Sequence, residues 1–363
     1  MRFDSLAEHT KFCFGFFFLF RSSTAPPAIL ALHCSSYNMT RCIFATPFFF
    51  LACFICCAIP SYALSTDQDL RNCVATGGTC VIDHGVKLQT FTALTITQNV
   101  TIMGSGNSFI DLMNNHSFAT FSTSDNLFLT IMELGIENGA GSSAFLTVGP
   151  KASFNLTNVI VQNMVSSLST GAIYGTTSIG RGYMLNVSFI NVTSSASGFS
   201  ISSMTSPIDW YLEDVNFFDC GISPTGSATG LFLIQNMGLV TTVTFAGTIN
   251  ISSSTLVENT ALTLKTTGGG SVTVLSSSEN PAHWSISGYA QLITTQSQGG
   301  PVVFAAETMK MVPGFPTSTS AFLFSTQSSL NGVGAVTFNV SDSIEVVGVS
   351  LLNSQTNTTL QAG

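Results

Sequence analysis

Two pairs of charged residues have the types and spacing to do chemistry. Asp214 and Asp219 form a carboxylate pair, and two carboxylates flanking a sugar bond are the acid and base of glycoside hydrolysis. They lie close together on what would be a single strand, where their side chains point to opposite faces, so joint catalysis is not expected. Arg181 and Asp209 lie much further apart in the sequence. They can act together only if the fold places two residues of that separation side by side.

Four segments in the middle of the chain repeat with nearly the spacing of Arg181 and Asp209. Each reads apolar, any residue, amide or acid, aliphatic, any residue, aliphatic or Phe, any residue, Asn or Asp. They span 131–138, 156–163, 184–191 and 212–219, so their starts are almost evenly spaced. Positions four and six alternate as one face of a strand does, and the closing Asn or Asp tolerates the left-handed backbone of a tight corner. Each unit is predicted to be a strand leading into a corner.

Such a period, with short strands and without helical spacing, predicts an all-β parallel solenoid whose coils bury their inward side chains against one another. The alternative is an antiparallel sandwich, which should show hairpin signals every ~8–12 residues. In register, two columns of polar residues stack, and their amides can bond along the column. Position eight gives the corner ladder Asn138, Asn163, Asn191 and Asp219, and position three gives Glu133, Asn158, Asn186 and Asp214.

The chain also resembles known β-helix proteins. The segments Gly77-Gly-Thr-Cys-Val-Ile82, Leu94-Thr-Ile96 and Asn99-Val-Thr-Ile-Met-Gly-Ser-Gly106 resemble the first turns of right-handed parallel β-helix, pectin-lyase-like proteins. The Asn-terminated units with Gly171-Ala-Ile-Tyr174 are similar to repeats of polymorphic outer-membrane proteins and other adhesin passengers. The resemblance covers roughly residues 70–235. It implies a right-handed parallel β-helix (solenoid) with one repeat per coil, working as an adhesin or as a polysaccharide lyase or hydrolase.

The enzymes of that family provide a test for catalysis. Their lyases use an Arg or Lys near Ca²⁺-binding carboxylates, and their hydrolases use clustered Asp residues with a Gly-His-Gly. Residues 64–363 have six basic and sixteen acidic residues and no Gly-His-Gly, and this charge has the wrong sign to attract an acidic uronan. Arg181 and Asp209, with Glu213 and Asp214 nearby, are left with two interpretations: an ion pair between coils, or a lyase-like base beside a cation site.

The composition of the chain excludes several classes of protein. Only 8% of the residues are charged and 45% are hydrophobic, while residues 64–363 contain 82 Ser and Thr. High hydrophobicity argues against disorder, and ten Lys and Arg in an acidic chain argue against nucleic-acid binding. Past residue 63, no apolar run reaches the ~20 residues that span a bilayer.

The segment 1–63 is predicted to be a leader with a signal peptide. Arg41 precedes an apolar run, Cys42 to Ile59, which is followed by Ser61-Tyr-Ala63, so cleavage is expected after Ala63 and Met39 is the expected start. The alternative is an uncleaved anchor at 42–59, the one membrane contact we expect. Behind the leader we expect a cap and first coil at 64–106, regular β-helix repeats at 107–235 and a less regular continuation at 236–363.

Three cysteines lie beyond the leader. Cys73 and Cys80 flank a predicted short strand pair around a Gly-Gly turn, and export permits a disulfide between them. Cys220 is expected to be a buried small hydrophobe rather than a reactive thiol. No Cys or Cys/His spacing suggests a metal site, and no cofactor is expected.

Other polar and aromatic residues offer surface roles. Trp210-Tyr211 could stack on a sugar, but strand alternation buries one of the two, so core packing is the alternative. Eight acceptor sequons, which a eukaryotic source would modify where exposed, start at Asn99, Asn115, Asn155, Asn186, Asn191, Asn250, Asn339 and Asn357.

Together these features predict a secreted or cell-surface β-helix protein. It would present a polar face for adhesion or for contact with glycans or surface proteins, without catalysis. The alternative is a divergent polysaccharide lyase or hydrolase of the pectin-lyase-like fold.

Overall fold

The structure is a computed structural model, and the chain divides into two compact units, Met1–Pro60 and Ser61–Gly363. The residues it describes all belong to the second unit: 63–122, 126–141, 145–148, 151–166, 173–175, 181–194, 197–203, 208–222, 230–237, 239–267, 269–298, 300–312, 322–328, 335–347, 350–354 and 358–362. The predicted signal peptide, with Met39 and the apolar run 42–59, lies outside the described residues. None of the helices in the described ranges has the length and apolar character to cross a membrane.

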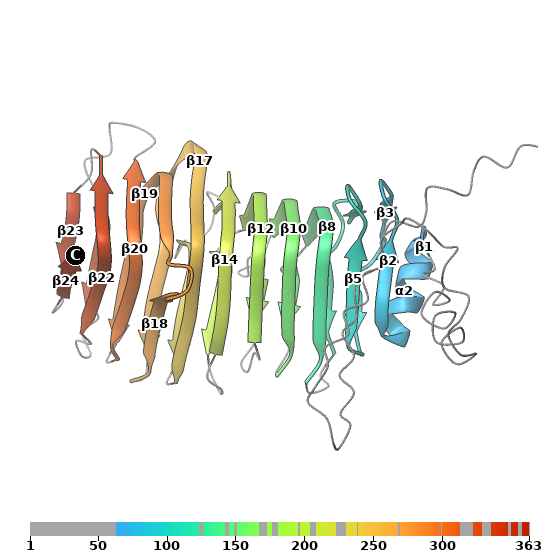
Figure 1. Ribbon diagram of the computed structural model, residues 1–363, viewed down its shortest axis with the longest axis horizontal. Helices are drawn as coiled ribbons and strands as arrows, with labels where there is room; N and C mark the ends of the chain where they lie inside the picture. The colour runs from blue at the N-terminus through green and yellow to red at the C-terminus, as the bar shows by residue number, and fades with distance from the viewer. Residues whose placement is uncertain are drawn as a thin grey trace, which may run out of the picture. The chain divides into compact units, whose positions relative to one another are not determined.

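Strands dominate the described residues, with one helix, α2 (Asp67–Thr76), near the start (Figure 1). The longer strands are β8 (Phe128–Gly141), β10 (Ser153–Ser166), β12 (Arg181–Ser194), β14 (Ile208–Phe218), β16 (Gly230–Met237), β17 (Val240–Thr267), β19 (His283–Gln298), β20 (Val302–Val312) and β22 (Val336–Val346). The shorter strands are β1 (Ala63–Leu64), β2 (Gly78–Ile82), β3 (Lys87–Gln89), β4 (Leu94–Ile96), β5 (Val100–Gly104), β6 (Phe109–Asp111), β7 (Ala119–Phe121), β9 (Leu146–Val148), β11 (Ile173–Gly175), β13 (Ser197–Ser203), β15 (Gly221–Ile222), β18 (Ser271–Ser276), β21 (Phe322–Ser328), β23 (Ser350–Ser354) and β24 (Thr358–Ala362).

These strands stack in parallel as successive coils, which confirms the predicted parallel β-helix. Leu156 of β10 pairs with Ile131 of β8 and with Met184 of β12, and Met184 pairs in turn with Leu212 of β14. The four repeat segments are therefore in register over their whole length, with the period seen in the sequence. Each coil pairs with the next through parallel hydrogen bonds, so in-register stacking sets which residues become neighbours.

Corners in the repeat are made by single residues in the left-handed conformation. At position eight, φ is 58° for Asn138, 54° for Asn163, 52° for Asn191 and 49° for Asp219. The residues at position three do the same, with φ between 52° and 53° for Glu133, Asn158, Asn186 and Asp214. The sequence pattern predicted this conformation only for position eight. Each long strand therefore bends twice, because Asn and Asp accept a left-handed backbone at lower cost than most residues.

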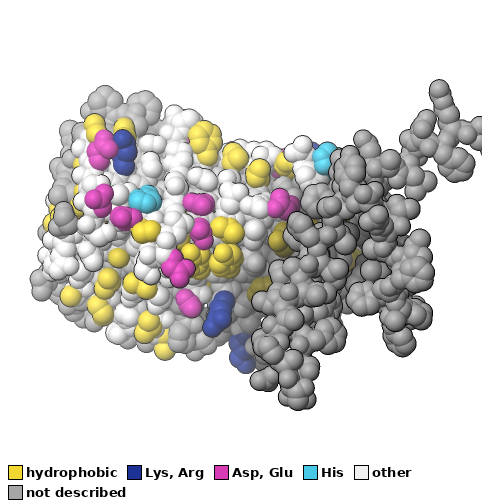
Figure 2. Space-filling model, in the orientation of Figure 1, with side chains coloured by type: hydrophobic (Ala, Val, Ile, Leu, Met, Phe, Trp, Pro, Cys, Tyr) yellow, Lys and Arg dark blue, Asp and Glu magenta, His cyan; other side chains and the backbone are white. Residues whose placement is uncertain are grey.

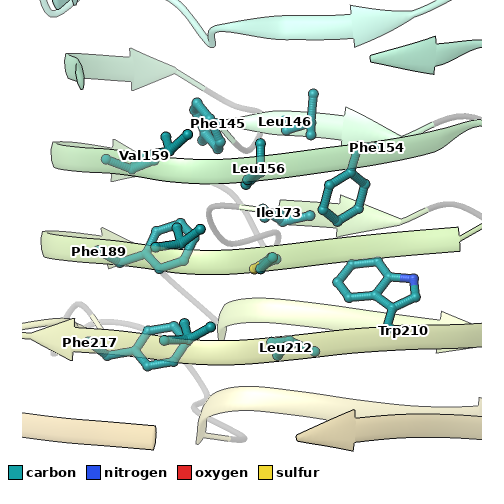
Figure 3. Close-up of a cluster of buried hydrophobic side chains, with 14 of the residues drawn as sticks. Phe145, Leu146, Phe154, Leu156, Val159, Ile173, Phe189, Trp210, Leu212 and Phe217 are labelled. Atoms are coloured by element: carbon teal, nitrogen blue, oxygen red, sulfur yellow. The ribbon is translucent and has the colours of Figure 1, made fainter. Parts of the chain in front are cut away.

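The core is filled by the inward side chains of alternate positions, many of them aromatic. The rings of Phe189 and Phe217 stack with centroids 5.3 Å apart, and the Phe154 ring meets Trp210 edge to face at 4.9 Å (Figure 3). Phe154 and Trp210 lie two coils apart and touch across Gly182. A Cβ on Gly182 would lie 2.7 Å from the indole carbons. Glycine at this inward position is what lets the two large rings meet.

An amphipathic helix covers the first coil. Thr66 caps α2 by accepting the Asp69 N–H, Asp67 and Asp69 fill its acidic first turn, and Leu70 and Val74 are buried. The strand pair predicted around Gly77-Gly78 is therefore wrong. The capping Thr66 and the acidic first turn start a helix before these glycines. The helix ends at Gly77, which has a φ of 79°. A disulfide joins Cys73 of α2 to Cys80 of β2 and ties this cap to the coil.

The later coils stack with more irregularity. The pairing of β14 with β17 shifts register between Glu213 and Val215, and the pairings of β17 with β19 and of β20 with β22 shift as well. At the first of these shifts Gly247, with φ of 61°, lies beside Asp214. One strand has a single extra residue at the β14–β17 and β20–β22 shifts, and β17 has several extra residues between Ser252 and Val257 opposite β19, yet every pairing stays parallel.

We expect Gly182→Ala to destabilise the protein by about 1–3 kcal/mol, because the new methyl group overlaps the Trp210 ring. Chemical denaturation would measure the loss. The double variant Gly182→Ala with Trp210→Phe, which shortens the opposing ring, should recover part of it. Equal stability of Gly182→Ala and the native chain would show that the rings do not meet across Gly182.

Candidate functional site

The candidate site lies on the outer surface of β12 and β14. Six outward side chains form two rows on adjacent coils, and register pairs each residue of one row with one of the other. We call this set the Tyr patch; its rows are Arg181, Tyr183 and Leu185, and Asp209, Tyr211 and Glu213. The row on the coil before consists of Ser153, Asn155 and Thr157, and the row on the coil after consists of Thr242, Thr244 and Ala246. The Tyr patch is an aromatic and charged island between rows of small uncharged residues.

The wider surface has the same character. Figure 2 shows one face of the molecule, on which white uncharged surface separates small groups of hydrophobic and charged side chains. Groups of hydrophobic and charged side chains recur on that face, so the Tyr patch is distinguished by its stacked aromatic pair rather than by clustering alone.

Two tyrosines form the centre of the Tyr patch. The rings of Tyr183 and Tyr211 stack with centroids 5.3 Å apart and an interplanar angle of 6°. The Tyr211 hydroxyl donates to Glu213 Oε2 at 3.1 Å, and Asn280 Nδ2 donates to Glu213 Oε1 at 2.9 Å. Partial burial and the Glu213 charge raise the pKa of both tyrosines. Both hydroxyls therefore remain protonated hydrogen-bond donors at neutral pH.

Arg181 and Asp209 are register partners at one end of the Tyr patch. Both residues are exposed. Within the described ranges no ion pair joins their side chains, although the Arg181 backbone N–H donates to Ser153 Oγ at 2.9 Å. In the same ranges no group of three or more His, Cys, Asp or Glu residues is arranged to hold a metal ion. The structure thus brings the predicted pair side by side but leaves both charged groups facing solvent.

Stacked amides run along both corner columns. At position eight, Asn191 Nδ2 donates to Asn163 Oδ1 at 3.0 Å, and Asn163 Nδ2 lies 3.5 Å from Asn138 Oδ1. At position three, Asn186 Nδ2 donates to Asn158 Oδ1 at 2.8 Å. Asn158 and Asn163 each donate toward the N-terminal coil and accept from the next asparagine, so both ends of these two amides are used.

Carboxylates stand at both ends of these ladders, and at the N-terminal end only an acceptor is needed. Glu133 Oε1 accepts from Asn158 Nδ2 at 2.6 Å, and Asp111 Oδ1 accepts from Asn138 Nδ2 at 3.1 Å. At the other end, Asp214 Oδ1 accepts the Thr248 N–H at 2.8 Å, and Asp219 Oδ1 accepts the Ser254 N–H. A carboxylate accepts but cannot donate, which explains why an acid can stand at the N-terminal end of each ladder. Asp214 and Asp219 follow the last asparagines and accept backbone N–H groups of the next coil instead.

We expect Asn158→Asp to cost about 1–2 kcal/mol more than Asn158→Gly at neutral pH. Both residues accept the left-handed backbone, but only Asp sets a second carboxylate against Glu133. Urea denaturation at several pH values would measure the difference, which should vanish as the carboxyl groups are protonated. A difference that persists in acid would contradict the ladder geometry.

A second charged cluster lies at the N-terminal end of the ladder. Asp111 and Glu137 are register partners on adjacent coils, and Asp111 is only 6% exposed. Lys87 Nζ lies 3.0 Å from Asp111 Oδ2 and 2.6 Å from Glu137 Oε1, and Gln162 donates to the other Glu137 oxygen. These two acceptors raise the pKa of Lys87. Burial opposes ionisation of Asp111, but hydrogen bonds from Met113, Asn138 and Lys87 outweigh it and lower its pKa. Lys87 thus neutralises two stacked carboxylates.

Lys87→Met is expected to cost about 1–2 kcal/mol at neutral pH, because it leaves the two shielded carboxylates stacked without a cation. The native pKa of Asp111 is depressed below its ordinary value of 3.8. Its stabilising contribution is therefore present above that pH and is lost as pH falls through the native pKa. Thermal unfolding across this range would follow the loss. Lys310→Met, which removes an exposed pair with Glu345, is the control and should change stability little at any pH.

The remaining predicted residues have mainly structural positions. Trp210 is buried and Tyr211 faces outward. Cys220 is buried, and this burial raises the pKa of its thiol to about 12. Of the predicted sequons, Asn186 and Asn191 donate within the ladders, and Asn99 Oδ1 accepts the Phe128 N–H. Asn155 Oδ1 accepts from Thr157 within its own sequon. Asn115, Asn250 and Asn339 are at least partly exposed, and Asn357 lies outside the described residues.

Two of these arrangements were not predicted from the sequence: the tyrosine pair and the Lys87 cluster. Tyr183 and Tyr211 have the same separation in the sequence as Arg181 and Asp209. Lys87, Asp111 and Glu137 meet because β3, β6 and β8 stack. Applying the repeat period to every aromatic and charged residue would have found the tyrosine pair.

Comparison with known proteins finds no matching family model, curated protein or solved structure.

Proposed function

We propose that this chain is a secreted or cell-surface β-helix protein that contacts glycans or surface proteins through the Tyr patch and does not catalyse a reaction. The observation that carries the proposal is the stacked pair Tyr183 and Tyr211, half-buried on the outer surface and flanked by charged groups. Aromatic side chains beside polar groups are typical of recognition surfaces.

The state of the charged groups supports binding over catalysis. Both oxygens of Glu213 already accept hydrogen bonds, from Tyr211 and Asn280. Arg181 is exposed, and a guanidinium has donors but no acceptor, so this side chain is suited to donate hydrogen bonds to a ligand. The competing function, a divergent polysaccharide lyase or hydrolase, depends on Arg181 acting beside Asp209.

Export is supported by the sequence of the leader and by the disulfide of the cap. An apolar run behind a basic residue and before small residues is typical of a signal peptide. The Cys73–Cys80 disulfide suits an oxidising compartment. No nucleic acid, metal or cofactor enters the proposal.

A glycan and cell-surface protein array, combined with a uronan-cleavage assay, tests this function on the purified protein. We expect binding without turnover, and no cleaving activity that Arg181→Ala removes. Turnover that disappears in Arg181→Ala would establish the lyase instead. Failure to bind any glycan or surface protein would overturn the proposed contact function.

A further inference from the structure

We propose that the Tyr patch binds an uncharged polysaccharide that lies extended along the axis of the β-helix, one sugar per coil. This inference rests on the proposed function and names its ligand. It follows from three properties of the patch: its repeat distance, its mixture of chemical groups and its charge.

The repeat distance of the patch suits a polymer. Successive coils of a β-helix are about 4.8 Å apart, and the two tyrosine rings repeat at 5.3 Å along the stack. An extended chain of linked pyranose sugars advances by nearly one such strand spacing per residue. Neighbouring sugars would therefore meet equivalent groups on neighbouring coils, first Tyr183 and then Tyr211.

The chemical groups of the patch suit a sugar. A pyranose has apolar C–H surfaces and a rim of hydroxyls, so it needs apolar contacts beside donors and acceptors. The tyrosine rings and Leu185 supply the apolar part. The Tyr183 hydroxyl has no hydrogen-bond partner among the described residues, and the guanidinium of Arg181 and carboxylate of Asp209 face solvent at one end. The patch thus offers donors and an acceptor that the protein itself leaves open.

The charge of the patch excludes acidic polymers. Asp209 and Glu213 outnumber Arg181 within the patch, and residues 64–363 have sixteen acidic against six basic residues. A uronan or sulfated chain would meet net repulsion, because it needs a positive surface to steer it. A neutral chain meets no such penalty. The flanking rows carry no charge: Ser153, Asn155 and Thr157 continue the polar surface on one side, and Thr242 and Thr244 continue it on the other, where Ala246 is buried.

Isothermal titration of the purified protein with neutral β-1,4-linked xylo-oligosaccharides of increasing length tests the proposal. Affinity should rise with each added sugar until the chain spans the patch and its flanking rows. Tyr183→Ala and Tyr211→Ala should each lower the affinity about tenfold or more, as loss of an aromatic anchor does. Phe218→Ala removes an exposed aromatic from the same strand beyond the corner at Asp214, and it should leave binding unchanged.

Tyr183→Phe and Tyr211→Phe keep the stacked rings, so they separate loss of a contact from loss of folding. Both should melt close to the native protein. Tyr183→Phe, which removes the open hydroxyl, should bind more weakly, whereas Tyr211→Phe, whose hydroxyl already donates to Glu213, should bind nearly as tightly as the native protein. An affinity that ignores chain length, tighter binding of oligogalacturonate, or equal effects of Phe218→Ala and the two Tyr→Ala variants would overturn the proposal. Array binding that survives both Tyr→Ala changes would overturn the polysaccharide site but leave the contact function standing. Uronan turnover would overturn both.

Discussion

The structure depends on parallel stacking of equivalent positions at a spacing of about 4.8 Å. Each residue of a coil lies directly above its counterpart, so a side chain in the repeat must be compatible with its own kind. Apolar and aromatic residues meet this requirement inside, as the stacked Phe189 and Phe217 show. Asparagine meets it at the corners, because one amide can donate to the rung below and accept from the rung above.

The same constraint accounts for the low charge of the sequence. Two like charges in register repel each other, whereas Ser, Thr and Asn can stack without that cost. Where acids do stack, as at Asp111 and Glu137, Lys87 lies between them. Where a charged pair stacks on the outer surface, Arg181 and Asp209 have opposite sign. The few charged residues on the outer surface therefore mark positions with a specific role. Three of them, Arg181, Asp209 and Glu213, lie together in the Tyr patch.

The sequence repeat predicted the fold and register because its period is a direct record of the stacking. It predicted position eight as a corner because Asn and Asp there have a known tolerance for positive φ. It did not predict the corner at position three. The first repeat has Glu133 there, and Glu, unlike Asn and Asp, gives no sequence signal for a left-handed backbone. It missed α2 because a short helix with two buried residues has little periodicity to read. The Tyr patch needed the register itself, since Tyr183 and Tyr211 carry no signal until the repeat spacing places them together.

The central claim is that β12 and β14 stack in the register that joins Tyr183 to Tyr211. Cysteines at Ser188 and Asn216, outward register partners on these strands, test it most directly, because in-register Cα atoms about 4.8 Å apart permit a disulfide. Ser188→Cys with Asn216→Cys should form the bond quantitatively on mild oxidation, as read by mass spectrometry. Ser188→Cys with Phe218→Cys, displaced along the strand to the next outward position, should not form it. Preferential bonding of the displaced pair would contradict the register and, with it, the Tyr patch.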